Sequence, residues 1–447
     1  MPDLPPVIGF VPIARPTFDV PLAQEMTQQV VQQLTGAGFS LVGTPYLVMD
    51  GEAVAERIRQ LQNTPPDLLL VLQASFADSS MVQALAAQVD APLLLWALPE
   101  ARVGGRLRLN SFCGINLAGH ALRRAGFNYE YVYAAPDNPA ALEKVRILAK
   151  AAAVRRRLRD TRIGRVGENP AGFETCIPNQ PALKAQLGLE VVPVDLQGIF
   201  AGVRAQPAEQ VAALAQTVKQ QVTGIDEMEA VATNGTLGTF LTLEHIAAAE
   251  RLDGLAVRCW PEFFTDLGCS ACGALSMLSN QLLPCSCESD VNGTITQLIL
   301  QWISGEPAFG SDLVSFDAAE DVAILWHCGL APLSMADPSV QPRATIHSNR
   351  KMPLLLEFPL KPGRVTLARL SEATGAFRLV IAGGEMLQAP PSFTGTTGTL
   401  RFDSGAAAVM DMMLREGLEH HLSLTYGDHR ETLLALAQML NLPVLEL

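Results

Sequence analysis

VIGFVPIA at residues 7–14 opens the stretch that decides the fold, and it is followed by LAQEMTQQVVQQLTGAG (22–38), FSLVGTPYLV (39–48), AVAERIRQLQN (53–63) and DLLLVLQ (67–73). Short apolar runs alternate with longer segments whose apolar residues recur at helical spacing, which is a β-α-β-α-β order. A helix is the usual connection between two parallel strands. The stretch therefore predicts a parallel sheet.

The same alternation continues through SSMVQALAAQV (79–89), APLLLWALP (91–99), GINLAGHALRRAG (114–126) and YEYVYAAP (129–136). The strand-like runs are apolar along most of their length, which is typical of a parallel sheet covered by helices on both faces. We therefore predict an N-terminal α/β domain over residues 1–155, which would carry substrate and oligomer contacts.

A second α/β unit follows. A helical segment rich in Ala, Arg and Lys (141–160) leads to a fresh strand and a Gly/Pro loop in RIGRVGENPAGFETC (162–176). Further strands are predicted in VVPVDL (191–196) and GLAVRCW (254–260), with helical segments between them. This pattern predicts a second doubly wound domain over residues 156–305.

After residue 305 short strands separated by turns replace the helices, as in DVAILWHCG (321–329), AFRLVIAGGEML (376–387) and GTLRF (398–402). This pattern of short strands and turns predicts a mostly antiparallel, barrel-like domain over residues 306–447. The predicted fold class is thus α/β, with two doubly wound parallel-sheet domains followed by a β-barrel-like C-terminal domain. Three domains agree with a length of 447 residues, because one domain averages roughly 150 residues.

Composition excludes several classes of protein. Hydrophobic residues make up 49% and charged residues 17% of the chain, which excludes global disorder and a coiled coil. The 32 basic and 45 acidic residues leave a net charge of −13, which argues against a nucleic-acid or anionic membrane surface. The N-terminal segment has no basic, apolar leader pattern, and no run of about 18 apolar residues appears later. We expect a cytoplasmic protein with a small ligand.

Eight cysteines are too few for a disulfide scaffold of this length, so reduced thiols are expected. Cys269 and Cys272 form a C-x-x-C pair, and Cys285 and Cys287 form a C-x-C pair, which would suit a zinc ribbon or a redox pair. Apolar residues surround both pairs, so we favour buried core thiols.

Two carboxylates follow predicted strands, where the loops of α/β proteins hold their ligands. Glu288 comes after LLPCSC and precedes Ser289 and Asp290, which can cap the next helix; the alternative is that Glu288 belongs to the first turn of that helix. Asp312 ends FGSD (309–312), and its alternative interpretation is a turn residue.

Three histidines complete the set of candidates. His327 lies in an apolar strand, where a satisfied core histidine is the alternative to a ligand. His420 and His421 are adjacent, and strand alternation would send their rings to opposite faces, so that at most one reaches a cleft. Two carboxylates and an imidazole would suit a hard or borderline ion such as Mn²⁺ or Mg²⁺.

These residues carry a family resemblance. CESDVNG (287–293), FGSD (309–312) and HLSLTYG (421–427) resemble segments of the L-fucose isomerase and L-arabinose isomerase family of metal-dependent aldose-ketose isomerases. The resemblance implies that Glu288 and Asp312 are catalytic and that both bind, with His421, Mn²⁺ or another divalent cation such as Mg²⁺ or Co²⁺.

Shorter matches imply substrate contacts. FVPIARPTFD (10–19) resembles the opening segment of the family, whose arginine reaches the site of a neighbouring subunit, and this would be Arg15. WPEF (260–263) places Trp260 or Glu262 at the sugar, although a structural glutamate is an equal alternative. His327, in WHCG, resembles an extra histidine ligand, and His420 neighbours the metal histidine. The resemblance also implies a homo-oligomer, with a hexamer favoured.

The substrate would be a small sugar that isomerises through a cis-enediolate, with the two metal-bound carboxylates as acid and base. No cluster of Arg or Lys singles out a phosphorylated or sulfonated sugar. Arg15, Arg102, Arg106 and Arg108 lie in loop-like segments that could face an anionic substituent, and their default interpretation is solvated surface charge. Two alternatives stay open: a non-catalytic sugar-binding or sensor protein of two α/β lobes, and a metal-dependent lyase on the same scaffold.

Overall fold

The computed structural model describes residues 5–43 and 45–447. The chain forms two compact units, Met1–Arg156 and Arg157–Leu447. The boundaries of the three domains stay a prediction. No helix among the described residues is both long and apolar enough to cross a membrane.

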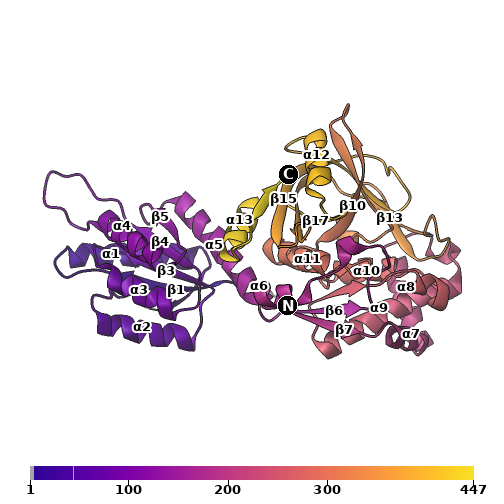
Figure 1. Cartoon of the computed structure of the whole chain (residues 1–447), viewed down its shortest axis with the longest axis horizontal. Coiled ribbons are helices and arrows are strands. Elements are labelled where there is room, and N and C mark those ends of the chain that lie inside the picture. The colour runs from indigo at the N-terminus through magenta and orange to yellow at the C-terminus, as the bar shows by residue number, and fades with distance from the viewer. Residues whose placement is uncertain (1–4, 44) are drawn as a thin grey trace. The chain divides into compact units, whose positions relative to one another are not determined.

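The first unit is built on a five-stranded parallel sheet in the order β2-β1-β3-β4-β5 (Figure 1). Its strands are β1 (Val7–Ile13), β2 (Ser40–Gly43), β3 (Leu68–Gln73), β4 (Leu93–Ala97) and β5 (Glu130–Tyr133). Its helices are α1 (Val20–Gly36), α2 (Gly51–Asn63), α3 (Ser79–Gln88), α4 (Ser111–Arg124) and α5 (Pro139–Leu158). Every residue of β3 and β4 is buried, which explains why these strands read as continuous apolar runs.

The second unit begins with a four-stranded parallel sheet in the order β7-β6-β8-β9. Its strands are β6 (Arg162–Val166), β7 (Glu190–Val194), β8 (Gly254–Val257) and β9 (Cys285–Ser286). Its helices are α6 (Gln180–Leu187), α7 (Leu196–Arg204), α8 (Ala208–Lys219), α9 (Ala230–Glu250), α10 (Cys272–Asn280) and α11 (Val291–Ser304). Both predicted parallel-sheet α/β regions are confirmed.

Six antiparallel strands then close into a barrel in the order β16-β11-β10-β17-β14-β15, because β15 pairs back to β16. Figure 1 labels β10, β15 and β17 of this barrel. They are β10 (Phe309–Asp317), β11 (Val322–His327), β14 (Gly363–Ser371), β15 (Arg378–Leu387), β16 (Thr396–Phe402) and β17 (His421–Tyr426). The remaining elements are β12 (Arg343–Thr345), β13 (Leu355–Pro359), α12 (Ala406–Glu416), α13 (Arg430–Met439) and β18 (Val444–Glu446). The predicted barrel-like C-terminal region is confirmed.

Helix α11 joins the barrel to the parallel sheet of the second unit. It contacts β14 and β17 of the barrel and β8 of the sheet. Thr296 on one side accepts a hydrogen bond from the Leu370 backbone of β14, and Thr294 on the other donates to the Leu255 carbonyl of β8. A helix that is buried nearly all round belongs to a core, and one apolar core runs through both parts. The N-terminus of α11 is therefore rigidly placed between them.

The cysteines depart from expectation. Cys259 and Cys287 form a disulfide with their Cα atoms 5.7 Å apart, so the expectation of reduced thiols is wrong for this pair. The reason is strand pairing, since β8 and β9 are neighbours and these two cysteines lie just beyond them. Cys272 lies 3.2 Å from Cys328, measured between the two sulfur atoms, whereas its C-x-x-C neighbour Cys269 is buried elsewhere in the core.

Gly273 in α10 packs against the backbone of Leu354. A Cβ atom at Gly273 would lie 2.6 Å from the Leu354 carbonyl oxygen, which cannot rotate away as a side chain can. We expect Gly273→Ala to lower the free energy of unfolding by about 1–3 kcal/mol, measured by urea denaturation. The matched control is Gly36→Ala at the exposed end of α1, where no heavy atom lies within 4 Å and the change should be neutral or slightly stabilising. Equal stability of both variants would contradict the close packing.

Candidate metal centre

Glu288 is positioned by a left-handed turn between β9 and α11. Its φ is 60° and that of Ser289 is 56°, a conformation that side chains other than glycine rarely adopt. Hydrogen bonds hold the turn: Asn169 Nδ2 donates to the Glu288 carbonyl at 2.8 Å, and the Ser289 N–H donates to the Val257 carbonyl at 3.1 Å. Helix α11 begins only at Val291, so the interpretation of Glu288 as a first-turn residue is wrong. Strain of this kind is concentrated at functional sites.

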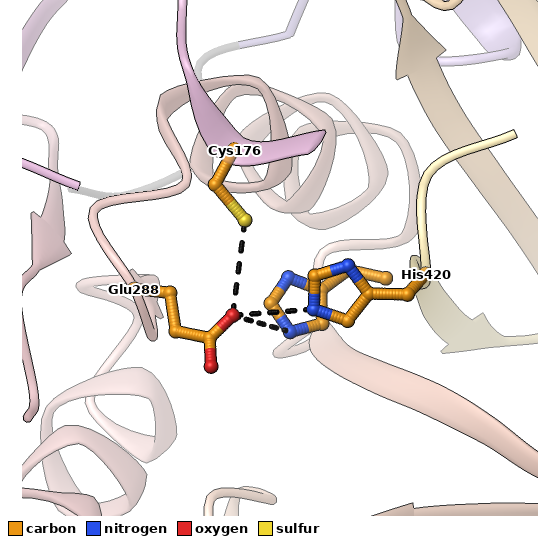
Figure 2. Close-up of side chains that lie close together, drawn as sticks. Cys176, Glu288 and His420 are labelled. Carbon is orange, nitrogen blue, oxygen red and sulfur yellow. Dashed lines mark hydrogen bonds and ion pairs between the residues drawn. The ribbon is translucent and has the colours of Figure 1, made fainter. Parts of the chain in front are cut away.

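The carboxylate of Glu288 lies among three donors. Trp260 Nε1 donates to Oε1 at 3.1 Å, while His420 Nε2 and the Cys176 thiol lie 3.2 Å and 3.8 Å from Oε2. Figure 2 shows the Cys176 and His420 side chains pointing toward the same oxygen of Glu288. Burial opposes ionisation, but the hydrogen bonds from His420 and Trp260 and the charge on His421 hold the pKa of Glu288 below its usual value. Glu288 is therefore an ionised, oriented carboxylate.

Asp290 organises the interior behind Glu288. Its side chain caps α11 by accepting from the Gly293 N–H at 2.9 Å, and it accepts two hydrogen bonds from Arg369, at 2.5 Å and 3.0 Å. It also lies 2.9 Å from His421 Nδ1. Burial favours the neutral acid, yet Arg369 and His421 hold the pKa of Asp290 well below its usual range. The ion pair with Arg369 is almost fully buried, since both side chains are 1% exposed.

His421 lies at the centre of the candidate site. With Nδ1 at Asp290, its other nitrogen, Nε2, faces Asp312 Oδ1 at 3.4 Å and Glu288 Oε2 at 3.9 Å. Burial opposes a charge on His421, but the hydrogen bond to Asp290 and the nearby carboxylates raise the pKa of the imidazolium well above its ordinary value. The carboxylates around His421 thus stabilise a positive charge on its ring.

Asp312 reaches His421 through strand pairing. The two residues are direct neighbours across β10 and β17, so the interpretation of Asp312 as a turn residue is wrong. The buried Oδ1 atom of Asp312 receives no hydrogen bond from any described residue. A buried carboxylate oxygen without a donor is expensive unless a cation faces it.

The other two histidines also lie here. His420 precedes β17, which starts at His421, so the alternation that would separate the two rings does not apply, and their centroids are 4.0 Å apart. The expectation that at most one of them faces the site is therefore wrong. His327 ends β11, and its ring lies 5.8 Å from that of His421. Burial lowers the pKa of His327 to about 4, which keeps the imidazole neutral.

The donors form two groups that share His421. Cys176, Glu288, His420 and His421 make one group, and Asp312, His327 and His421 make the other, with the ligand atoms of each group within 4.8 Å of one another. Carboxylates and imidazoles suit Mn²⁺, Mg²⁺ or Co²⁺. A ligating histidine usually donates its second N–H to a carboxylate, and Asp290 is placed to accept it. The residues present therefore fit a divalent cation.

Sequence reasoning missed several residues of the site. Cys176 and Thr175 lie in a short 3-10 helix (Glu174–Cys176) within the connection after β6, and Thr175 Oγ1 is 2.8 Å from His420 Nδ1. Phe173 of the same loop packs edge-on against Trp260 and His420, with ring centroids 5.1 Å and 5.9 Å away. The only available signal was that this Gly/Pro-rich loop follows a predicted parallel strand, where binding loops gather.

Other predicted residues are engaged elsewhere. Glu262 forms a two-pronged ion pair with Arg258, both contacts being 2.7 Å, which favours the structural interpretation.

Arg106 and Arg108 of the first unit pair with Asp19. Arg15, also in the first unit, donates its backbone N–H to Ser75 and stacks on Phe76 at 5.8 Å from the ring centroid. A substrate role for Arg15 stays a prediction, as does a role for Arg102.

Two family models and several known proteins are similar to this chain. Residues 9–159 match the family model for the fucose/sulfoquinovose isomerase N-terminal domain, and residues 325–447 match the L-fucose isomerase C-terminal domain. The chain is 32% identical over 434 residues to the sulfoquinovose isomerase of Priestia megaterium, with 97% of each chain covered. It is 31% identical over 439 residues to the sulfoquinovose isomerase of Alkalicoccus urumqiensis, with 98% of each covered.

Replacing Asp290 should destabilise the second unit. Asp290→Asn would leave Arg369 buried without its counter-charge, so we expect a loss of about 3–5 kcal/mol in unfolding free energy, measured by urea denaturation with tryptophan fluorescence. The control is Asp411→Asn, which removes a carboxylate that is 60% exposed and pairs with Arg415, and it should change stability by less than about 1 kcal/mol. An Asp290→Asn protein as stable as the control would refute the organising role of this carboxylate.

Proposed function

Because the chain belongs to the fucose/sulfoquinovose isomerase family, we propose that it interconverts sulfoquinovose and the corresponding ketose through a cis-enediolate. The reaction class, aldose-ketose isomerisation, follows from the family. The finer assignment rests on relatives that are named sulfoquinovose isomerases, whereas the sequence alone left the identity of the sugar open. Sulfoquinovose is a glucose whose C6 hydroxyl is replaced by a sulfonate.

One observation supports the proposal most strongly. Two carboxylates, Glu288 and Asp312, approach the same nitrogen of His421, while Asp290 holds the other nitrogen. We propose that Glu288, Asp312 and His421 hold a divalent cation, with His327 close enough to assist. When bound, the cation would stabilise the negative charge that develops on O1 and O2 and would make the C2 proton more acidic.

The residues of the chain would then move the protons. Isomerisation requires one proton to move between C1 and C2 and another between the two oxygens. Glu288 is kept ionised and is oriented by Trp260, so it can accept a proton from carbon. Asp312, whose Oδ1 has no described hydrogen-bond donor, can exchange the oxygen-bound proton on the other side.

His420 would connect Glu288 with water. Its Nε2 faces Glu288 and its Nδ1 faces Thr175 Oγ1, while 38% of its side chain is exposed. A proton taken up by Glu288 can therefore exchange with solvent through this imidazole. Solvent deuterium should then appear at C1 of the ketose and, through the reverse reaction, at C2 of the aldose.

This deuterium uptake provides the test of the function. We expect ketose formation and C2 deuteration when sulfoquinovose is incubated in D₂O with the Mn²⁺-loaded protein, followed by NMR. Both should be lost after EDTA treatment and dialysis and restored by Mn²⁺ or Co²⁺, because the carboxylates alone cannot stabilise the developing charge. Circular dichroism of the metal-free protein controls for unfolding.

The outcomes separate the three candidate functions. Binding of the sugar without deuteration or ketose would favour the non-catalytic sugar-binding protein. Carbon–carbon or carbon–oxygen cleavage without ketose would favour the lyase. Full turnover after metal removal would reject the metal-dependent mechanism.

Glu288→Gln tests the proposed base. The amide keeps the shape of the side chain but cannot accept the proton, so kcat should fall by about 10²–10⁴-fold while the fold is retained. The control is Glu306→Gln, which removes an exposed carboxylate just after α11 and should leave kcat within about twofold of wild type. Retained turnover by Glu288→Gln with bound metal would reject the assignment.

A further inference from the structure

Arg350 presents a positive charge beside the candidate site. Its guanidinium lies over the ring of Trp260, 4.7 Å from the centroid, and over the ring of Phe264, at 5.0 Å. The indole N–H at the edge of the same ring donates to Glu288. The side chain of a single aromatic residue therefore separates this cation from the proposed base.

Arg350 also differs from the other arginines near the site. Arg258 is neutralised by Glu262, Arg369 by Asp290, and Arg165 by Glu168. No carboxylate of a described residue forms an ion pair with Arg350, and Arg350 is solvent-exposed. Its charge is therefore available to a ligand.

Hydrogen bonds stabilise the loop that carries Arg350. His347 Nδ1 accepts from the backbone N–H groups of Asn349 at 3.3 Å and Arg350 at 3.4 Å, and the His347 carbonyl accepts from the Lys351 N–H at 2.7 Å. The buried His347 ring packs edge-on against Phe264, with centroids 5.5 Å apart.

The end of the same loop is tied to the α/β part of the second unit. The Leu354 N–H donates to Thr236 Oγ1 of α9 at 3.1 Å, and the Leu354 carbonyl accepts from the Gly273 N–H of α10 at 3.1 Å. A guanidinium that is already stacked on two rings and held by a fixed loop loses little conformational freedom when it binds an anion.

We infer that Arg350 binds the anionic substituent at C6 of the sugar and so sets the preference for a sulfonated aldose, an inference that rests on the function proposed above. The planar fork of a guanidinium can donate two parallel hydrogen bonds to a sulfonate. The reacting C1 and C2 would lie at Glu288 and Asp312, so the opposite end of the six-carbon chain extends away from them. The Trp260 ring supplies an apolar surface along that path.

The test compares two sugars that differ only at C6, sulfoquinovose and D-glucose, with the Mn²⁺-loaded full-length protein. Arg350→Met keeps an apolar stem on the two rings but removes the charge. We expect kcat/KM for sulfoquinovose to fall by about 10- to 100-fold, mainly through KM, while C2 deuteration of D-glucose changes by less than about threefold. Arg350→Lys keeps the charge without the planar fork, so its kcat/KM for sulfoquinovose should lie between those of wild type and Arg350→Met.

Two controls sharpen the result. Arg415→Met removes an arginine of α12 that is 76% exposed, and it should leave kcat/KM for both sugars unchanged. Raising the ionic strength should raise KM for sulfoquinovose with the wild-type protein but not with Arg350→Met, because salt screens only the interaction that the charge provides.

Calorimetric binding of sulfoquinovose separates failure of this inference from failure of the proposed function. If the wild-type protein binds the sugar without producing ketose, the isomerase proposal fails, and weaker binding by Arg350→Met still supports the role of Arg350. The inference would be overturned if Arg350→Met lowered kcat/KM equally for both sugars, or did not lower kcat/KM for sulfoquinovose. Absence of both binding and turnover in the wild-type protein would overturn both.

Discussion

The buried carboxylate of Asp290 is the constraint on which the rest of the second unit depends. It caps α11, neutralises Arg369 of β14 and holds His421 of β17. A carboxylate that is nearly inaccessible to water is stable only when its charge is compensated and its oxygens accept hydrogen bonds. Arg369 and His421 both belong to the barrel, so the same carboxylate fixes the barrel against the start of α11 and orients the imidazole.

The candidate site follows from that constraint. While Asp290 holds His421 Nδ1, the Nε2 atom of the same ring faces Glu288 and Asp312. Asp312 arrives by cross-strand pairing in the barrel, and Glu288 arrives from the parallel sheet through a strained turn. Two kinds of sheet therefore each supply one carboxylate, which explains how they can approach the imidazole from different directions.

Charge is distributed unequally around this centre. Asp290 and Arg369 compensate each other's charge. The remaining carboxylates of the interior exceed its fixed cations, and this excess of negative charge suits a divalent cation. Arg350 is exposed and stacks on the ring of Trp260. A ligand with hydroxyl groups at one end and an anion at the other would match both features. Trp260 is then the shared element, because it orients Glu288 and supports Arg350.

Local patterns in the sequence determined the fold class, since apolar alternation depends only on which residues face a core. The motifs around Glu288, Asp312 and His421 also indicated a family. The position of His420 was misjudged because β17 begins one residue later, and the start of that strand depends on its pairing with β10. Asn169 and Cys176 had only the signal of a Gly/Pro-rich loop after a predicted strand, and Arg369 and Arg350 carry no local signal, because their contacts are with residues distant in the chain. Only the tertiary structure brings such residues together, since long-range strand pairing and buried charge compensation are properties of the whole unit.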